Sequence, residues 1–375
     1  MIVRELCCRD FRNLHAERLC PAPGVNILYG DNAQGKTNLL EACWLFTGAR
    51  SFRGAKDSEL VSFDADEARL TMNFFAGERE QQAEIRIRQR RSVTLNGVRL
   101  PSAAKLAGHL CGVVFSPAHL SLIRDGPEGR RHFTDAAYCQ LRPGYIGALA
   151  EFRQVLAQRN AFLRQAAEQK LSVSRQHDML PLWDHTLAAA GARITAARLR
   201  YIRRLEPLAA EIYAGLSGGR EKLTLRWQTE AFSPEEWDQT EEPSPVRIAE
   251  AWLAVLNAAD KADLAAGFST VGPHREDMLL LLDGAPARSF GSQGQQRSIV
   301  LALKLAEAAL LQQTTGEPPV AFLDDVMSEL DVTRQDYILN HIHDWQVFIT
   351  CCEPTTALRM TAGEVFHIQQ GVIQK

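Results

Sequence analysis

Residues 30–37 read GDNAQGKT and stand between a short apolar run at 24–29 and a second apolar segment at 38–46. The spacing of the apolar residues predicts a buried strand before this octapeptide and a helix after it. The octapeptide fits the pattern G-x-x-x-x-G-K-[ST], whose glycines let backbone N–H groups curl around a phosphate. The stretch therefore predicts a P-loop in an α/β fold.

Two side chains of the P-loop have separate expected roles. Lys36 reaches the β and γ oxygens of a nucleoside triphosphate, and the Thr37 hydroxyl ligates Mg²⁺. The alternative, an ordinary glycine-rich turn, leaves Lys36 and Thr37 unexplained. We therefore expect ATP and Mg²⁺ as cofactors. The predicted ATP-binding residues are Gly30, Asp31, Asn32, Ala33, Gln34, Gly35, Lys36, Thr37 and Asn38.

A second candidate element is the stretch PPVAFLDD at 318–325, an apolar strand that ends in two carboxylates. In a parallel sheet the end of such a strand faces the nucleotide, so Asp324 would hold Mg²⁺ with Thr37 and Asp325 would polarise an attacking water. Lys36, Asp324 and Asp325 are accordingly the predicted catalytic residues. The alternative is that one of the two acids only caps a helix.

Ahead of this strand, residues 289–298 read SFGSQGQQRS, which resembles the S-G-G-Q signature of ABC-type ATPases. Ser292, Gly294 and Gln295 match the signature, and Gln293 replaces a glycine. In ABC-type ATPases the signature caps the γ-phosphate held by the P-loop of a second protomer. The resemblance implies a twofold dimer held together by ATP, with Asp331 in a loop that meets the partner.

The strand expected at 347–351 lacks the histidine that ABC-type ATPases usually carry at its end. Sensing of the γ-phosphate is therefore left to Thr350 or to no residue, and slow hydrolysis is expected.

The rest of the chain alternates between three patterns. Residues 69–100 have period two with an Asn96-Gly97 turn, which predicts an antiparallel sheet. Residues 145–215 have helical spacing, with an apolar seam suited to packing on a helix at 149–163. The α/β pattern returns after residue 267, with strands at 278–282, 320–323 and 347–351. The seam consists of Leu187, Ala190, Ile194, Ala197, Tyr201, Leu205, Leu208 and Ile212.

These patterns predict an α/β fold with an ABC-type P-loop ATPase head, made of a mixed sheet and an antiparallel β subdomain. The head is discontinuous, at 1–144 and 265–375, and a short helical arm at 145–264 interrupts it. A turn-rich acidic stretch at 217–247 precedes a helix expected at 246–256.

Net charge, cysteine spacing and the lengths of apolar runs limit the classes of protein to which the chain can belong. The chain has 42 basic and 45 acidic residues and a net charge of −3, so contact with nucleic acid needs a local basic patch. The eight cysteines show no C-x-x-C spacing, which indicates reduced thiols rather than zinc ligands or disulfides. No run of about 18 apolar residues occurs. We expect a cytoplasmic protein with no membrane contact.

The distance from Lys36 to Ser292 separates the candidate ATPases. A transporter ATPase subunit has a much shorter interval, whereas a long insert is typical of the chromosome-maintenance and recombination ATPases. Two alternatives stay open: an ATPase subunit that energises membrane transport, and a small-molecule kinase with a P-loop, which would not need Ser292.

The chain resembles the RecF family over nearly its whole length. The residues that carry the resemblance are FRNL at 11–14, GPEGRRHF at 126–133 followed by Asp135, QRNA at 158–161, GPHRED at 272–277 and GSQGQQR at 291–297. One departure is His119, which stands where the family pattern would have an acid.

The resemblance implies an ATP-dependent, DNA-binding dimer that hydrolyses ATP weakly. It implies binding to double-stranded, single-stranded and gapped junction DNA. It also implies that the protein acts together with RecO and RecR to help RecA displace single-strand-binding protein. Such a bacterial protein acts in DNA replication, recombination and repair and associates with the nucleoid when it is bound to DNA.

Two basic clusters are candidates for the DNA contact. Arg86, Arg88 and Arg90 share one face of an expected strand. The second arm helix carries Arg198, Arg200, Arg203 and Arg204. For each cluster the alternative is a solvated basic face. Arg86, Arg88, Arg200 and Arg204 are the predicted DNA-binding residues.

Overall fold

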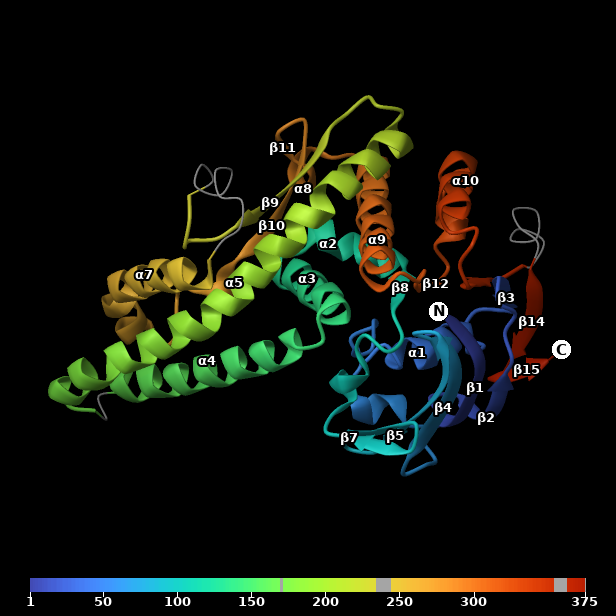
Figure 1. Cartoon of the computed structure of the whole chain (residues 1–375), viewed down its shortest axis with the longest axis horizontal. Helices are drawn as coiled ribbons and strands as arrows, with labels where there is room; N and C mark the ends of the chain where they lie inside the picture. Colours follow the sequence, from blue (N-terminus) through green and yellow to red (C-terminus); the bar gives the residue numbers. More distant parts are fainter. Residues whose placement is uncertain (169–170, 234–243, 354–362, 375) are drawn as a thin grey trace. The chain divides into compact units, whose positions relative to one another are not determined.

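The computed structural model describes residues 1–168, 171–233, 244–353 and 363–374. It divides into two compact units (Figure 1). The head unit comprises Met1–Ile123, Leu208–Lys222 and Gly291–Lys375, and the arm unit comprises Arg124–Pro207 and Leu223–Phe290. Each unit is described separately below.

The division differs from the predicted one at its boundaries. Residues 124–144 and 265–290 fall in the arm unit, because helix α3 (Pro127–Leu141) packs on strand β10 (Asp277–Leu282) and the Arg130 guanidinium pairs with the Asp277 carboxylate at 2.6 Å. Conversely, Leu208–Lys222 belongs to the head. Helical periodicity cannot reveal either assignment, because it identifies an element but not the surface on which the element packs.

The centre of the head is a six-stranded sheet in the order β15-β14-β3-β13-β12-β8. The five strands from β14 to β8 are parallel, and β15 is antiparallel to its neighbour β14. The inner strands are buried on both faces, which explains their continuous apolar sequences. The bounds are β3 Val25–Tyr29, β8 Gly112–Phe115, β12 Val320–Leu323, β13 Val347–Cys351, β14 Glu364–Gln369 and β15 Val372–Gln374.

Three helices of the head carry the predicted motifs: α1 (Lys36–Leu45), α9 (Gln293–Thr315) and α10 (Val332–His341). The Trp44 ring of α1 meets Phe322 of β12 edge to face at 6.5 Å, and Phe322 stacks on Phe348 of β13 at 5.6 Å. These aromatic contacts fix α1 against the sheet.

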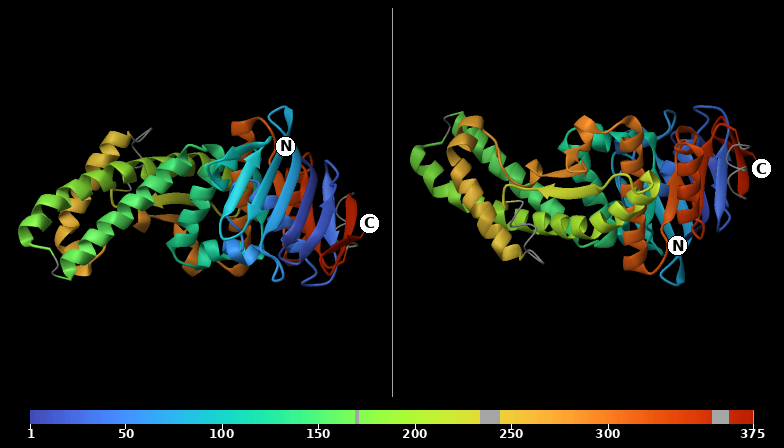
Figure 2. Two further views of the ribbon diagram at one scale, coloured as in Figure 1. Left: turned by 90° about the horizontal axis from the view of Figure 1, so that it is seen from below. Right: turned by 90° about the horizontal axis from the view of Figure 1, so that it is seen from above.

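The head also contains a six-stranded antiparallel sheet in the order β2-β1-β4-β5-β6-β7 (Figure 2, left). Its β6–β7 turn places Asn96 at φ 49° and Gly97 at φ 78°, the left-handed pair typical of the predicted two-residue hairpin. The mixed sheet and the antiparallel subdomain are both confirmed. The bounds are β1 Ile2–Phe11, β2 Leu14–Leu19, β4 Ala68–Ala76, β5 Arg79–Ile87, β6 Arg91–Leu95 and β7 Val98–Leu100.

Shorter helical turns connect these elements. They are η1 (Asp57–Leu60), η2 (Ala103–Leu106), η3 (Pro117–Leu120), α2 (Ser121–Arg124) and η5 (Met327–Glu329).

The arm is built from α3 and three longer helices, α4 (Tyr145–Ala167), α5 (Val173–Ser217) and α7 (Pro245–Ala266), the last ten residues of α5 belonging to the head unit. Every residue of the predicted apolar seam except Leu208 is buried. Helix α7 runs ten residues beyond the predicted end and stops where Gly267 adopts φ 73°. A small sheet accompanies the helices: β9 (Leu223–Gln228), β10 and β11 (Ala285–Pro286), with turns η4 (Pro273–Arg275) and α8 (Ala287–Phe290).

Helices α4, α5 and α7 meet around one buried arginine. The Arg159 guanidinium of α4 lies 2.7 Å from Asp184 of α5 and 2.6 Å from Asp263 of α7, and all three side chains are fully buried. It also donates to the Ser269 hydroxyl at 2.8 Å. A buried charge needs such partners to offset the cost of leaving water. The QRNA stretch at 158–161 thus joins the three arm helices.

Among the described residues, no helix combines the length and the apolar character needed to cross a bilayer.

Candidate nucleotide site

The P-loop curves between β3 and α1 as predicted, and two of its glycines are sterically required. Gly30 adopts φ 148°, and a Cβ there would lie 2.2 Å from the Ile368 carbonyl oxygen. Gly35 adopts φ 111°, and its Cβ would lie 2.9 Å from the Asn13 Oδ1. Any side chain at these positions would push the loop away from its neighbours.

The Lys36 side chain is buried within the loop that it closes. Its Nζ donates to the Gly30 carbonyl at 2.6 Å and to the Asp31 carbonyl at 2.9 Å. An ammonium has three donors, so one remains for a phosphate oxygen. The loop therefore presents a cation together with the N-terminus of α1.

Thr37 and Asp324 meet although 287 residues separate them. The Thr37 hydroxyl donates to Asp324 Oδ1 at 2.7 Å. Burial raises the pKa of the Asp324 carboxyl above its ordinary value, against the opposing effect of this hydrogen bond. A hydroxyl and a carboxylate in contact form part of the hard oxygen set that Mg²⁺ prefers, so these residues fit the predicted metal.

Thr350 holds both acidic residues at the end of β12. Its hydroxyl donates to Asp324 Oδ1 at 3.1 Å and accepts the Asp325 backbone N–H at 2.8 Å. Asp325 itself adopts the left-handed φ of 53°. Thr350 thus contacts the Asp324 carboxylate and the Asp325 backbone at the carboxyl ends of β12 and β13.

The P-loop lines a pocket of about 1040 Å³ in the head. Its lining includes seven of the nine predicted ATP-binding residues, Asn32 through Asn38, as well as Asp325. Beyond the predicted residues it adds Arg12, Asn13, Arg53, Ser58, Glu59, Val61, Ser62, Phe63 and Ala65. Gly30, Asp31 and Asp324 are not part of this lining.

A chain of hydrogen bonds links three of the lining residues. Arg53 donates to Asn38 Oδ1 at 3.0 Å, and Asn38 Nδ2 donates to Asn13 Oδ1 at 2.7 Å. Arg12 pairs with the buried Glu41 through two bonds of 2.5 and 3.1 Å. The FRNL stretch was the sequence signal for Arg12 and Asn13. No motif marks residues 58–65, which only the fold brings to the pocket.

The signature residues lie apart from this pocket. Ser292 is the exposed N-cap of α9 and shares a capping box with Gln295, whose Oε1 accepts the Ser292 N–H at 2.6 Å. Gln295 Nε2 also donates to Glu221 at 2.5 Å. Ser292, Gln293, Gly294 and Gln295 do not line the P-loop pocket.

Asp331 and the signature helix are tied together by Arg334. Asp331 caps α10 by accepting the Arg334 N–H at 3.0 Å and forms an ion pair with its guanidinium. The backbone bond, more than the charge, lowers the pKa of the Asp331 carboxyl. The same guanidinium donates to Ser298 Oγ at 2.9 Å and to the Gly294 carbonyl at 3.3 Å.

His119, the departure from the family pattern, is a structural residue. Its Nδ1 accepts the Ser116 N–H at 3.2 Å, and burial lowers the pKa of its imidazole to about 3. The ring is therefore neutral at physiological pH and does not line the pocket.

Both basic clusters predicted for DNA need correction. Strand β5 ends at Ile87, so Arg88 and Arg90 lie in a turn and do not share a strand face with Arg86. Arg86 pairs with Glu84 at 2.5 Å and Arg88 with Glu67 at 2.6 Å, which neutralises their charges locally.

In the arm cluster, Arg198 is wrong as a candidate. It is buried, and its guanidinium pairs with Asp135 and Glu276, each at 2.8 Å. Arg200 is half-buried and Arg204 is exposed on α5. The helical spacing of apolar residues placed Arg198 on the helix correctly. That spacing could not show that Asp135 and Glu276, from other elements, form ion pairs with it.

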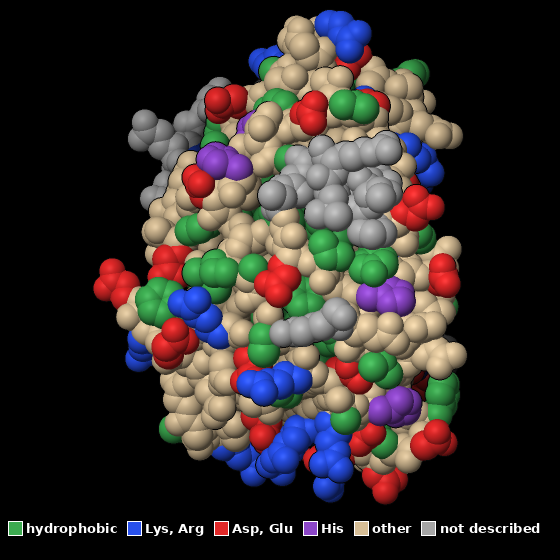
Figure 3. All heavy atoms as spheres, turned by 90° about the vertical axis from the view of Figure 1, so that its right-hand side faces the viewer, with side chains coloured by type: hydrophobic (Ala, Val, Ile, Leu, Met, Phe, Trp, Pro, Cys, Tyr) green, Lys and Arg blue, Asp and Glu red, His purple; other side chains and the backbone are tan. Residues whose placement is uncertain are grey.

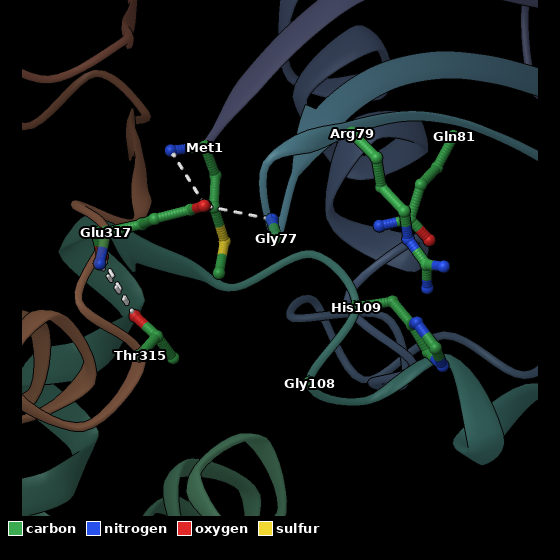
Figure 4. A pocket seen from close by; sticks show the side chains of 8 residues that line it. All are labelled: Met1, Gly77, Arg79, Gln81, Gly108, His109, Thr315 and Glu317. Atoms are coloured by element: carbon green, nitrogen blue, oxygen red, sulfur yellow. Dashed lines mark hydrogen bonds and ion pairs between the residues drawn. The ribbon is translucent and has the colours of Figure 1, made fainter.

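A second, smaller pocket of about 410 Å³ lies elsewhere in the head (Figure 4). Figure 4 shows Arg79, Gln81 and His109 on one side and Met1 with Glu317 on the other. None of the predicted nucleotide-binding residues lines it.

Comparison with known proteins agrees with this geometry. The family model described as RecF/RecN/SMC N terminal domain matches residues 2–374. The DNA replication and repair protein RecF of Synechococcus sp. (strain JA-3-3Ab) is 39% identical over 378 residues, which cover 100% of this chain and 97% of that protein. RecF of Acetivibrio thermocellus is 34% identical, with 98% of each chain covered.

Solved structures extend the comparison. The recombination mediator protein RecF with ATP, of the RecFOR pathway, superimposes with a TM-score of 0.91 at 35% identity, covering 100% of this chain and 97% of that one. An Smc head domain from Pyrococcus furiosus shares the fold alone, with a TM-score of 0.54 at 16% identity. The ABC-type ATPase fold is therefore confirmed, and identity over the full length shows that the chain belongs to the RecF family.

Proposed function

We propose that this protein is an ATP-dependent recombination mediator that binds DNA as a dimer. The observation that carries the proposal is the hydrogen bond between Thr37 and Asp324, next to the buried Lys36. This contact brings a phosphate-binding lysine and two metal-binding side chains together from distant parts of the chain. ATP is the proposed ligand because the solved relative of the RecFOR pathway contains it. Mg²⁺ is the proposed metal, held by Thr37 and Asp324 with the nucleotide.

The position of the signature supports the dimer. Ser292 is exposed at the start of a 23-residue helix and does not line the P-loop pocket of its own chain. An N-terminus of this kind binds anions through its free N–H groups and its dipole. We therefore propose that Ser292, Gln293, Gly294 and Gln295 complete the site of a second copy, with Asp331 at the contact. Each copy would contribute equally, as a twofold interface requires.

Within the site, each residue has a proposed part in hydrolysis. Lys36 stabilises charge on the transferred phosphoryl group, Asp324 holds the metal, and Asp325 orients the water. Thr350 positions both acids but cannot take up a proton as a histidine does, so weak ATPase activity is proposed. The metal, when bound, would neutralise charge on the phosphates.

The DNA and protein partners follow from family membership. We propose binding to duplex, single-stranded and gapped junction DNA, and cooperation with RecO and RecR in helping RecA to load at gaps and stalled forks. Cytoplasmic location is part of the same proposal. Membership of the RecF family disfavours a transport ATPase, and the presence of the signature disfavours a small-molecule kinase.

The function is tested by measuring affinity for gapped DNA and molar mass in parallel, with ATP and Mg²⁺, with ATP and EDTA, and without nucleotide. ATP with Mg²⁺ should double the molar mass and raise the DNA affinity at least tenfold. ATP binding without a change in either quantity would contradict the proposed dimer on DNA. Light scattering and fluorescence anisotropy give the two readouts.

Charge distribution bears on where DNA binds. On the face shown in Figure 3, acidic and basic side chains are interspersed, with several Lys and Arg side chains together at its lower edge. We propose phosphate contact through the predicted arginines of one of the two basic clusters, either Arg200 and Arg204 on α5 or Arg86 and Arg88 at the end of β5.

Replacing both Arg200 and Arg204 by alanine should reduce the slope of log affinity against log salt concentration by about 2, since each lost phosphate contact contributes about 0.9 on duplex DNA. The measurement is a salt titration of DNA binding by anisotropy. The double change Arg86→Ala and Arg88→Ala is measured in parallel. The pair of changes that lowers the slope identifies the cluster that contacts DNA, and an unchanged slope in both variants contradicts both assignments.

A further inference from the structure

The P-loop pocket is also lined by an aromatic side chain that has no proposed role in binding the phosphates or the metal. Phe63 lies in the loop between η1 and β4 and lines the same pocket as Lys36 and Thr37. Its relative accessibility is 108%, the highest among the exposed large apolar residues of the described chain. Singly exposed apolar side chains are common on protein surfaces, so the position of the ring in this pocket is what distinguishes it.

The loop that carries Phe63 is anchored to strand β1. The Ser62 N–H donates to the Asp10 carbonyl at 2.9 Å, and the Ser62 hydroxyl donates to the Arg12 carbonyl at 2.5 Å. A further backbone bond joins Ala65 to Ser62 at 3.1 Å, and Val61 forms a bridge with Phe11. These bonds hold the backbone of the loop at the position from which the exposed Phe63 side chain reaches the pocket.

The chemistry of this end of the pocket differs from that of the P-loop end. Residues 58–65 contribute Ser58, Val61 and Ala65 to the lining, and the only charge among the lining residues of this loop is the Glu59 carboxylate. The neighbouring Arg12 guanidinium donates to the Glu59 carbonyl at 3.5 Å and is paired with the buried Glu41. The apolar side chains of this loop and the Ser58 hydroxyl suit the nucleoside part of a nucleotide better than its phosphates.

We propose that Phe63 is the platform on which the purine base of the bound nucleoside triphosphate stacks. The proposal rests on the proposed function, since Lys36 and Thr37 must hold the phosphates of the same molecule. A pocket of about 1040 Å³ has room for both parts. Every base has a π-face, so stacking supplies affinity without selecting among bases.

The test compares ATP with inorganic tripolyphosphate, which has the phosphates but no base. Phe63→Ala should weaken ATP binding about 10-fold, because stacking of one base on an aromatic side chain contributes on this order. The same change should leave tripolyphosphate affinity unaltered, and Phe63→Trp should retain ATP affinity. Calorimetric titrations of the full chain with each probe measure both dissociation constants.

Val98→Ala is the matched control, because Val98 is an exposed apolar residue on β7 and does not line the pocket. Unchanged ATP affinity in Phe63→Ala, or an equal loss for ATP and tripolyphosphate, overturns the proposal. A loss of ATP-dependent molar mass at unchanged ATP affinity also overturns it and assigns Phe63 to a protein interface. If the unaltered chain binds neither probe, the nucleotide site itself is refuted, and this inference falls with it.

Discussion

Arginine in place of Ser292 is expected to abolish the ATP-dependent doubling of molar mass while leaving ATP binding by the P-loop within about twofold of normal. The signature helix α9 begins with a small, exposed capping residue, and a long side chain there keeps the helix N-terminus from approaching a phosphate on the partner. Loss of the cap costs about 1 kcal/mol, too little to unfold a helix whose middle is buried. Light scattering with ATP and Mg²⁺ gives the mass, and calorimetry gives the affinity.

The control for this variant uses the same helix. Gln313→Arg adds an equal charge and a similar volume near the C-terminal end of α9, at an exposed position. This variant should form the dimer normally and gain DNA affinity with ATP. A Ser292→Arg protein that still doubles its mass would contradict the proposed role of the signature in the partner site.

Methionine in place of Lys36 is expected to weaken ATP binding about 10- to 150-fold. A charge-assisted hydrogen bond contributes about 1.5–3 kcal/mol, and the ammonium has one donor left for a phosphate oxygen besides those bonded to the Gly30 and Asp31 carbonyls. Methionine has a similar length but no charge, so the side chain still fills the buried space beside Gly30. The dimer and the gain in DNA affinity should disappear with the nucleotide. Calorimetric titration with ATP measures the loss.

Lys105→Met removes the same charge from an exposed position on η2 and is the matched control. It should bind ATP normally. Thermal unfolding of both variants separates a local effect from loss of fold. Normal ATP affinity in a folded Lys36→Met protein would show that the octapeptide is not the phosphate site.

The sequence was sufficient to predict the contiguous parts of the site. The P-loop, the end of β12 and the start of α9 each depend on a local pattern of glycine, apolar and capping residues, and the structure has each of them at the predicted residues. The Asn96-Gly97 hairpin was predictable for the same reason, since its conformation is set by two adjacent residues.

The features of the site that the sequence did not show depend on contacts between residues that lie far apart in the sequence. Arg198 has the same local surroundings as its neighbours, and only folding brings Asp135 and Glu276 to it. Phe63 looks like any loop residue until the anchoring bonds to β1 place it in the pocket. Likewise, the role of Thr350 is visible only when β13 lies beside β12.

The guanidinium of Arg334 bonds at once to Asp331, to Ser298 and to the Gly294 carbonyl. It therefore connects the N-terminal turn of α9 to the start of α10, the two elements proposed to meet the partner. Because one side chain bonds to both elements, we expect a displacement of one to be accompanied by a displacement of the other when the proposed dimer separates.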